Sequence, residues 1–244
     1  MTLLILAGTA EARELAKYCA TEKIPALASL SGATRKPAPL TIPTRHGGFG
    51  GVDGFISFVK EQNISAILDA THPFASFITE RTFQVSQELG LPMMRFDRPE
   101  WKPSEGDKWT FINDESEAIN YISSPLNVFL ATGRQSLFKF KNIRNSRLYC
   151  RQIDPPDMPF PWLNGTFIIA RPPFSEVAEK ALFIELNIDV LIVKNSGGSA
   201  SRTKLDAARS LEIPVLMINR PPPTPASTLR SLTEIKIWLD NLNK

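Results

Sequence analysis

This chain of 244 residues has little cysteine and little histidine, with two residues of each. Cys19 and Cys150 are far apart, form no CxxC pair and have no histidine beside them. Zinc sites need closely spaced cysteine or histidine ligands, so we expect no metal centre. Isolated thiols are typical of a reduced compartment, which favours a cytoplasmic protein.

Long apolar runs are missing as well. The first run, residues 3–7, has no Lys or Arg before it and is too short for the core of a signal peptide. No run in the sequence approaches the length that crosses a bilayer. We therefore expect a soluble protein with no membrane partner.

Neither sign of charge is in large excess. The chain has 28 basic and 25 acidic residues, a formal charge of +3, and no dense basic run. Nucleic-acid-binding proteins usually show such runs, so no nucleic-acid partner is expected. A local basic pocket in such a protein is still able to hold a polyanionic small molecule.

Short apolar runs alternate with helical patterns along the chain, and each run is continuous, as in strands that are covered on both faces. Strands are predicted at residues 3–7, 25–30, 40–45, 66–70, 92–96, 109–112, 128–131, 148–153, 167–170, 190–194 and 215–219. Helices are predicted around residues 12–19, 55–59, 74–89, 115–122, 177–188, 204–211 and 232–242. This alternation predicts an α/β fold with mainly parallel sheets.

The two halves of the chain resemble each other. Residues 67–99 and residues 190–221 each run from a buried strand through a loop and a helix to a second strand and an Arg-Pro pair. Residues 97–108 hold prolines, a glycine and several charges, which is typical of a linker. We predict two Rossmann-like units, residues 1–108 and 109–244; chance similarity between two strand–helix–strand segments is the alternative.

Two loops of the first half are candidate ligand sites, because ligands of parallel sheets bind where loops leave the carboxyl ends of strands. The opening loop, residues 7–13, holds Gly8 and leads into a helix whose first N–H groups can bind phosphate. It is not a GxGxxG loop, and a plain tight turn is the alternative. The glycine loop, residues 45–51, combines Arg45 with four glycines and can hold a phosphate or carboxylate. A flexible surface loop is its alternative.

Two further loops are rich in polar residues. The histidine loop, residues 69–75, places His72 after a strand, and a histidine can donate a proton near neutral pH. A structural histidine is the alternative there. The serine–glycine loop, residues 194–199, follows a buried strand and is typical of an anion site. A solvated basic helix start is the alternative.

Taken together, these segments resemble the precorrin-6A reductase family. The histidine loop and the strand before it, residues 67–75, are similar to the most recognisable signature of that family. Residues 8–13, Arg45 with 47–50, 132–134, and 194–198 with 204–209 resemble further blocks of the family, in the same order along the chain. One departure is Ala7-Gly8-Thr9, where the family commonly has Gly-Gly-Thr.

The resemblance implies NAD(P)H-dependent reduction of one double bond of the precorrin-6A macrocycle, which gives precorrin-6B on the way to cobalamin. It also implies two Rossmann-like units without a GxGxxG loop. On this hypothesis the cofactor, which we expect to be NADPH with NADH as the alternative, binds Gly8, Thr9, Ala10, Glu11, Gly47, Gly48 and Thr71. The carboxylates of the tetrapyrrole substrate bind Arg45, Arg134, Lys194, Ser196, Gly197 and Lys204. His72 is the candidate catalytic proton donor, beside solvent or a substrate carboxylic acid.

Two other functions remain possible interpretations of the residues alone. A Rossmann reductase or epimerase that acts on nucleotide sugars usually has a GxGxxG loop and a Tyr-x-x-x-Lys pair, and neither occurs here. A two-lobed protein that binds an anionic ligand is normally exported with a signal peptide. The pattern does not separate metal-free from cobalt-bearing substrate, and it leaves the oligomeric state and any strand exchange open.

Overall fold

The computed structural model describes residues 1–32 and 34–242. They form two compact units: unit 1 consists of Met1–Pro99 with Pro221–Lys244, and unit 2 consists of Glu100–Arg220. The boundary predicted after residue 108 therefore differs from the structure in two respects. Trp101 is buried in the core of unit 2, so the segment before residue 109 already belongs there. The last helix packs into the core of unit 1, because its apolar face joins the first helix.

The sheet of unit 1 has the strand order β3-β2-β1-β4-β5-β12 over the described residues. Its strands are β1 (Thr2–Leu6), β2 (Ala26–Leu30), β3 (Thr44–His46), β4 (Ile64–Asp69), β5 (Met93–Phe96) and β12 (Thr228–Leu229). Its helices are α1 (Ala10–Thr21), α2 (Val52–Glu61), α3 (Ser76–Leu89) and α6 (Leu232–Leu242). The printed registers of all these strand pairs are parallel.

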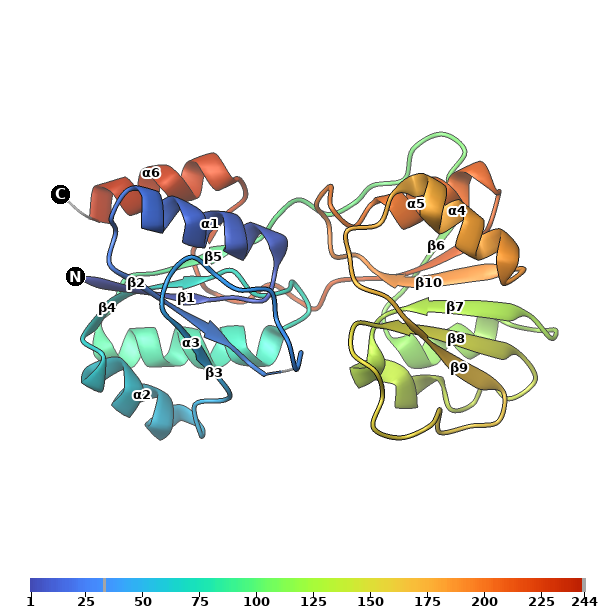
Figure 1. The fold of residues 1–244 in the computed structure, drawn as a ribbon, viewed down its shortest axis with the longest axis horizontal. Helices are drawn as coiled ribbons and strands as arrows, with labels where there is room; N and C mark the ends of the chain where they lie inside the picture. Colours follow the sequence, from blue (N-terminus) through green and yellow to red (C-terminus); the bar gives the residue numbers. More distant parts are fainter. Residues whose placement is uncertain (33, 243–244) are drawn as a thin grey trace. The chain divides into compact units, whose positions relative to one another are not determined.

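Helices cover both faces of this sheet (Figure 1). Leu3 and Ile5 of β1 pack in the same core cluster as α1 and α6. Leu4 and Leu6 point the other way and pack with α2 and α3. Successive side chains of a strand alternate between its faces, so a continuous apolar run such as β1 needs a helix layer on each side.

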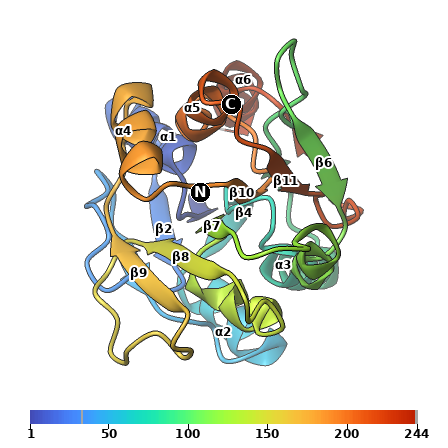
Figure 2. The same ribbon diagram turned by 90° about the vertical axis from the view of Figure 1, so that its right-hand side faces the viewer.

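The sheet of unit 2 has the strand order β9-β8-β7-β10-β11-β6 over the described residues, again with parallel pairs, and Figure 2 shows it from β9 at one edge to β6 at the other. Its strands are β6 (Trp109–Ile112), β7 (Asn127–Ala131), β8 (Arg147–Gln152), β9 (Gly165–Ile169), β10 (Val190–Lys194) and β11 (Val215–Ile218). Its helices are the 3-10 helices η1 (Glu115–Tyr121) and η2 (Arg134–Phe140), and the α-helices α4 (Glu176–Glu185) and α5 (Thr203–Ser210).

The two sheets share one topology. Each sheet has the Rossmann strand order 3-2-1-4-5-6 when the strand from the other half of the chain is counted as the sixth. The first and fourth strands are β1 and β4 in unit 1, and β7 and β10 in unit 2. The similarity between the two halves of the sequence thus corresponds to a shared strand order in the two sheets. The sixth strand is exchanged: β6 follows β5 along the chain but lies in unit 2, and β12 follows β11 but lies in unit 1.

The predicted α/β class with two parallel Rossmann-like sheets is confirmed. Three elements differ from the prediction. The strand expected at residues 40–45 is limited to Thr44–His46, consistent with Pro43 having no N–H for a ladder. The two-residue strand β12 and the helix η2 had no apolar pattern long enough to indicate them.

Candidate functional site

Three of the candidate loops leave the same edge of the unit 1 sheet. The opening loop follows β1, the glycine loop follows β3 and the histidine loop follows β4. Because the strands are parallel, all three lie at their carboxyl ends. In the sheet, β2 lies on one side of β1 and β4 lies on the other, so the strand order changes direction between β1 and β4. Ligands of Rossmann-type sheets bind at this switch point.

Thr9 joins the opening loop to the histidine loop. Its Oγ1 accepts a hydrogen bond from the N–H of Ala12 at 3.1 Å and donates one to the carbonyl of Ala70 at 2.8 Å. Gly8 beside it has a φ of 133°, and a Cβ there would meet no described atom within 4 Å. The loop therefore needs glycine and has open space in front, as a phosphate-binding turn requires.

The carboxylate of Glu11 has a partner that the sequence did not indicate. It accepts a hydrogen bond from Arg98 at 2.8 Å, and both side chains are largely buried. Burial lowers the pKa of Arg98, while Glu11 and Asp97 act in the opposite direction. The N–H groups of Ala10 and Glu11 lie in the first turn of α1, where a helix supplies no acceptor. These N–H groups, and not the carboxylate, fit the pyrophosphate of a dinucleotide.

Arg45 is turned into its own loop. Its guanidinium donates to Ser29 Oγ and the Gly47 carbonyl at 2.8 Å each, and to the Gly48 carbonyl at 2.9 Å. It also stacks on the ring of Phe49, with 4.3 Å from Cζ to the ring centroid. Arg45 thus braces the glycine loop with three of the five N–H groups of its guanidinium.

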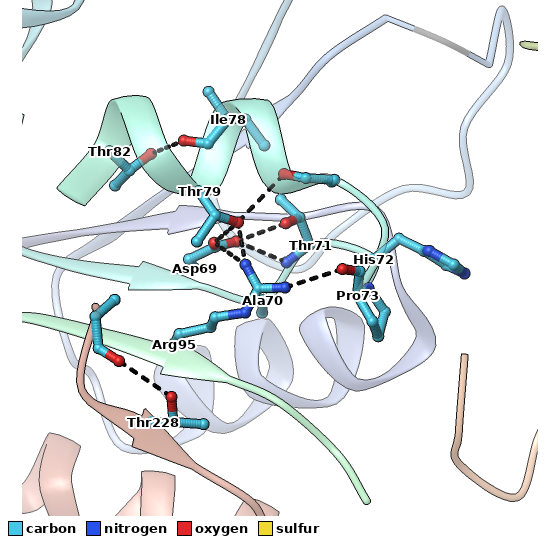
Figure 3. A network of polar contacts seen from close by, with 12 residues as sticks. Asp69, Ala70, Thr71, His72, Pro73, Ile78, Thr79, Thr82, Arg95 and Thr228 are labelled. Atoms are coloured by element: carbon cyan, nitrogen blue, oxygen red, sulfur yellow. Dashed lines mark hydrogen bonds and ion pairs between the residues drawn. The ribbon is translucent and has the colours of Figure 1, made fainter. Parts of the chain in front are cut away.

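Buried charges fix the shape of the histidine loop (Figure 3). Asp69 accepts hydrogen bonds from the N–H and the hydroxyl of Thr71 at 3.0 and 2.6 Å, and from the hydroxyl of Thr79 at 2.6 Å. Arg95 of β5 forms an ion pair with Asp69 at 3.1 Å, contacts the Thr79 hydroxyl and donates to the carbonyl of Pro73 at 3.3 Å. The start and the middle of the loop are thus both tied to one buried pair.

His72 lies between these two attachments and is exposed. Its ring points away from the buried network in Figure 3. Its Nδ1 accepts a hydrogen bond from the N–H of Phe74 at 3.2 Å. When the ring is neutral, this bond places its proton on Nε2.

The predicted substrate residues of unit 2 differ in exposure. Arg134 is exposed and opens η2 after Gly133. Lys194 forms an ion pair with the largely buried carboxylate of Glu115 at 3.2 Å. In the serine–glycine loop, Ser196 is buried and Gly197 has a φ of 67°.

Lys204 is buried, which the sequence did not indicate. It is 9% exposed, donates to the carbonyl of Ser201, and has its Nζ 5.7 Å from the ring centroid of Trp101. Burial lowers the pKa of Lys204 to about 8, and the charge of Arg151 acts in the same direction. Its ammonium is therefore held inside unit 2, near the start of α5.

The described residues show no group of three or more His, Cys, Asp or Glu side chains suited to a metal ion. Both cysteines are buried and unpaired within the same residues. None of the described helices is both long and apolar enough to span a membrane.

The fold and these loops define a protein of two linked Rossmann-type units, with three candidate loops at the switch point of unit 1. The model of the family described as Precorrin-6x reductase CbiJ/CobK matches residues 2–240. The chain belongs to this family.

Relatives agree over the full length. The chain is 41% identical to a protein named Precorrin-6A reductase from Sinorhizobium sp, with 97% of this chain and 93% of that protein covered. It is 41% identical to a Precorrin-6A reductase from Rhodococcus erythropolis, with 99% and 98% covered. A solved structure titled CobK precorrin-6A reductase matches with a TM-score of 0.95 at 35% identity, covering 99% of this chain and 96% of that one.

Proposed function

We propose that this protein reduces one double bond of precorrin-6A to give precorrin-6B, with a hydride from NADPH. The family match over residues 2–240 carries the proposal. The geometry of unit 1 supports it, because Thr9 caps α1 and joins two loops at the switch point, beside the first N–H groups of that helix. The metal-free substrate follows the names of the relatives at 41% identity.

In this proposal unit 1 binds the nicotinamide nucleotide, which supplies the hydride. The pyrophosphate lies at Gly8 and the N–H groups of Ala10 and Glu11, with further contacts from Gly47, Gly48 and Thr71. NAD-specific Rossmann proteins usually place an acidic residue near the end of the second strand to bind the ribose hydroxyl. Residues 29–36 contain no acid but do contain Arg35 and Lys36, which favours the 2′-phosphate of NADPH.

Unit 2 supplies substrate ligands in this proposal. Arg134 and the serine–glycine loop follow the first and fourth strands of its sheet, the positions that flank the switch point. A guanidinium and backbone N–H groups bind carboxylates by charge-assisted hydrogen bonds. The ammonium of Lys194, which pairs with Glu115, has further N–H donors for the same anion.

Thermal unfolding with NADPH, NADH or no nucleotide tests the proposal first. A ligand that binds only the folded state raises the unfolding midpoint. We expect a clear rise with NADPH and a smaller one with NADH, followed by loss of NADPH absorbance when precorrin-6A is added. Binding of either nucleotide without turnover of precorrin-6A would reject the substrate and leave a nicotinamide-dependent reductase.

Arg35→Ala tests the nucleotide preference. The midpoint shift given by NADPH should fall toward that given by NADH, while the NADH shift is unchanged. An equal loss for both nucleotides would mean that Arg35 does not contact the 2′-phosphate.

A further inference from the structure

The serine–glycine loop is held by side chains from the two segments where the chain enters and leaves unit 2. Trp101 lies just after the entry at Glu100, and Arg220 is the last residue before the exit. The backbone N–H of Trp101 donates to the Asn195 side-chain oxygen at 2.9 Å, and the Asn195 side-chain nitrogen donates to the Trp101 carbonyl at 3.2 Å. We call Trp101, Arg220 and the Asn195 side chain the clasp.

The clasp binds three backbone carbonyls of residues 195–198. Arg220 donates to the carbonyl of Asn195 at 2.9 Å and to that of Ser196 at 3.1 Å. The indole Nε1 of Trp101 donates to the carbonyl of Gly198 at 2.7 Å. Trp101 is 5% exposed and Asn195 is 2% exposed, and the two bonds between them are buried, whereas the three bonds to the loop carbonyls are partly buried.

The direction of these carbonyls sets the direction of the amides. In a trans peptide the C=O and the following N–H point to opposite sides. The N–H groups of Gly197 and Ser199 therefore point away from Arg220 and Trp101. Gly197 and Gly198 have φ values of 67° and 78°, a left-handed conformation that glycine adopts without strain.

We infer that Trp101 and Arg220 are positioning residues, which hold the serine–glycine loop in the shape that receives a carboxylate of the substrate. The inference rests on the proposed function for the identity of the ligand. It does not require either side chain to touch the substrate. A clasp that only anchors the two chain segments would change stability when weakened, but would leave the loop amides and substrate affinity unchanged.

Trp101→Phe tests this, because it keeps a buried aromatic ring and removes the indole N–H, together with part of the ring volume. Trp109→Phe is the matched control: it is the same change in the same unit, and the Trp109 Nε1 has no hydrogen-bond partner among the described residues. The Ser196 N–H donates to the Lys194 carbonyl at 2.6 Å and therefore reports on the shape of the loop. In the full-length protein, Trp101→Phe should speed hydrogen exchange of the Ser196 amide by about fivefold, the factor that corresponds to the free energy of one hydrogen bond. KM for precorrin-6A should rise by a similar factor, with kcat and KM for NADPH within about twofold. Trp109→Phe should change none of these.

Arg220 gives an independent second variant. Arg220→Lys retains one donor group where the guanidinium serves two carbonyls, so it should raise KM for precorrin-6A less than Arg220→Met does. Wild-type exchange rates and wild-type KM in Trp101→Phe would overturn the inference, as would equal effects of Trp101→Phe and Trp109→Phe. If the wild-type protein does not reduce precorrin-6A, the proposed function fails, and the exchange rates alone decide whether the clasp shapes the loop.

Discussion

At the scale of single residues, His72 is the group whose role is most readily tested. His72→Ala should slow turnover of precorrin-6A by more than about tenfold, the usual contribution of a general acid. His72→Asn is the matched variant, because its side-chain oxygen can still accept the Phe74 N–H that His72 Nδ1 accepts. Slow turnover in both variants, in steady-state assays near neutral pH, would support proton donation. Wild-type turnover in His72→Asn would show that the ring only shapes the loop.

Lys204 should give the stability of the protein a measurable pH dependence. Burial lowers its pKa to about 8, so the folded state loses this proton before the unfolded state does. The unfolded state then binds more protons between about pH 8 and about pH 10, and stability rises with pH in that window. Lys204→Met should flatten the rise and increase Tm near pH 7 by about 2–6 °C. Equal pH dependence of Tm in wild type and variant would contradict this.

The two thiols should be unreactive in the native protein. Burial raises the pKa of Cys19 to about 11 and that of Cys150 to about 12, and both residues are fully buried. The thiolate is the reactive form, so little of it exists near pH 8. A chromogenic disulfide reagent should modify the native protein at less than about a tenth of the rate seen in denaturant. Fast labelling of one thiol without denaturant would show that its segment opens.

The sequence predicted where the candidate loops lie in the fold better than it predicted what their side chains contact. The pattern of small and polar residues after buried strands located all the loops. The pattern did not show which basic side chains already have partners within the protein. Arg45 donates to a carbonyl of its own loop, and Lys194 forms an ion pair with Glu115 of η1. Arg98 and Arg220 were visible only as the repeated Arg-Pro pair, whose partners lie far away along the chain.

At the scale of secondary-structure elements, β4, α3 and β5 are joined by the Asp69–Arg95–Thr79 network. Arg95→Met leaves a buried carboxylate without its cation and should lower the free energy of unfolding by about 3–5 kcal/mol. The control is Arg81→Met, which removes a guanidinium that stacks on the exposed ring of Phe77 and should cost less than about 0.5 kcal/mol. Urea unfolding of both variants measures the difference. A loss below about 1 kcal/mol in Arg95→Met would mean that Thr71 and Thr79 suffice to satisfy Asp69.

Most elements were predictable because their signal is local. A strand buried on both faces, such as β1 or β10, is a continuous apolar run, and an amphipathic helix repeats its apolar residues every three or four positions. The strand β12 has two residues and lies in its sheet because of its pairing with β5. Such an element depends on a partner far away in sequence, so no local pattern indicates it.

At the scale of the whole molecule, the exchanged sixth strands make unit 1 discontinuous in sequence. A chain that ends after residue 220 lacks both β12 and α6, whose Ile235 and Leu239 are fully buried in the core. It should lose the stabilisation by NADPH in thermal unfolding. Residues 100–220 contain all of unit 2 and should fold cooperatively as a separate fragment. Retention of the NADPH shift by the shortened chain would place the nucleotide outside unit 1.

The same exchange reverses the order in which the units can mature during synthesis. Residues leave the ribosome from the N-terminus onward, and domains fold as units when their last element is available. Unit 2 is complete once Arg220 has emerged, whereas unit 1 still waits for Pro221–Lys244. The part of the chain made first is therefore the part finished last. Until then the edge of β5, which pairs with β12 in the finished sheet, is open to other nascent chains.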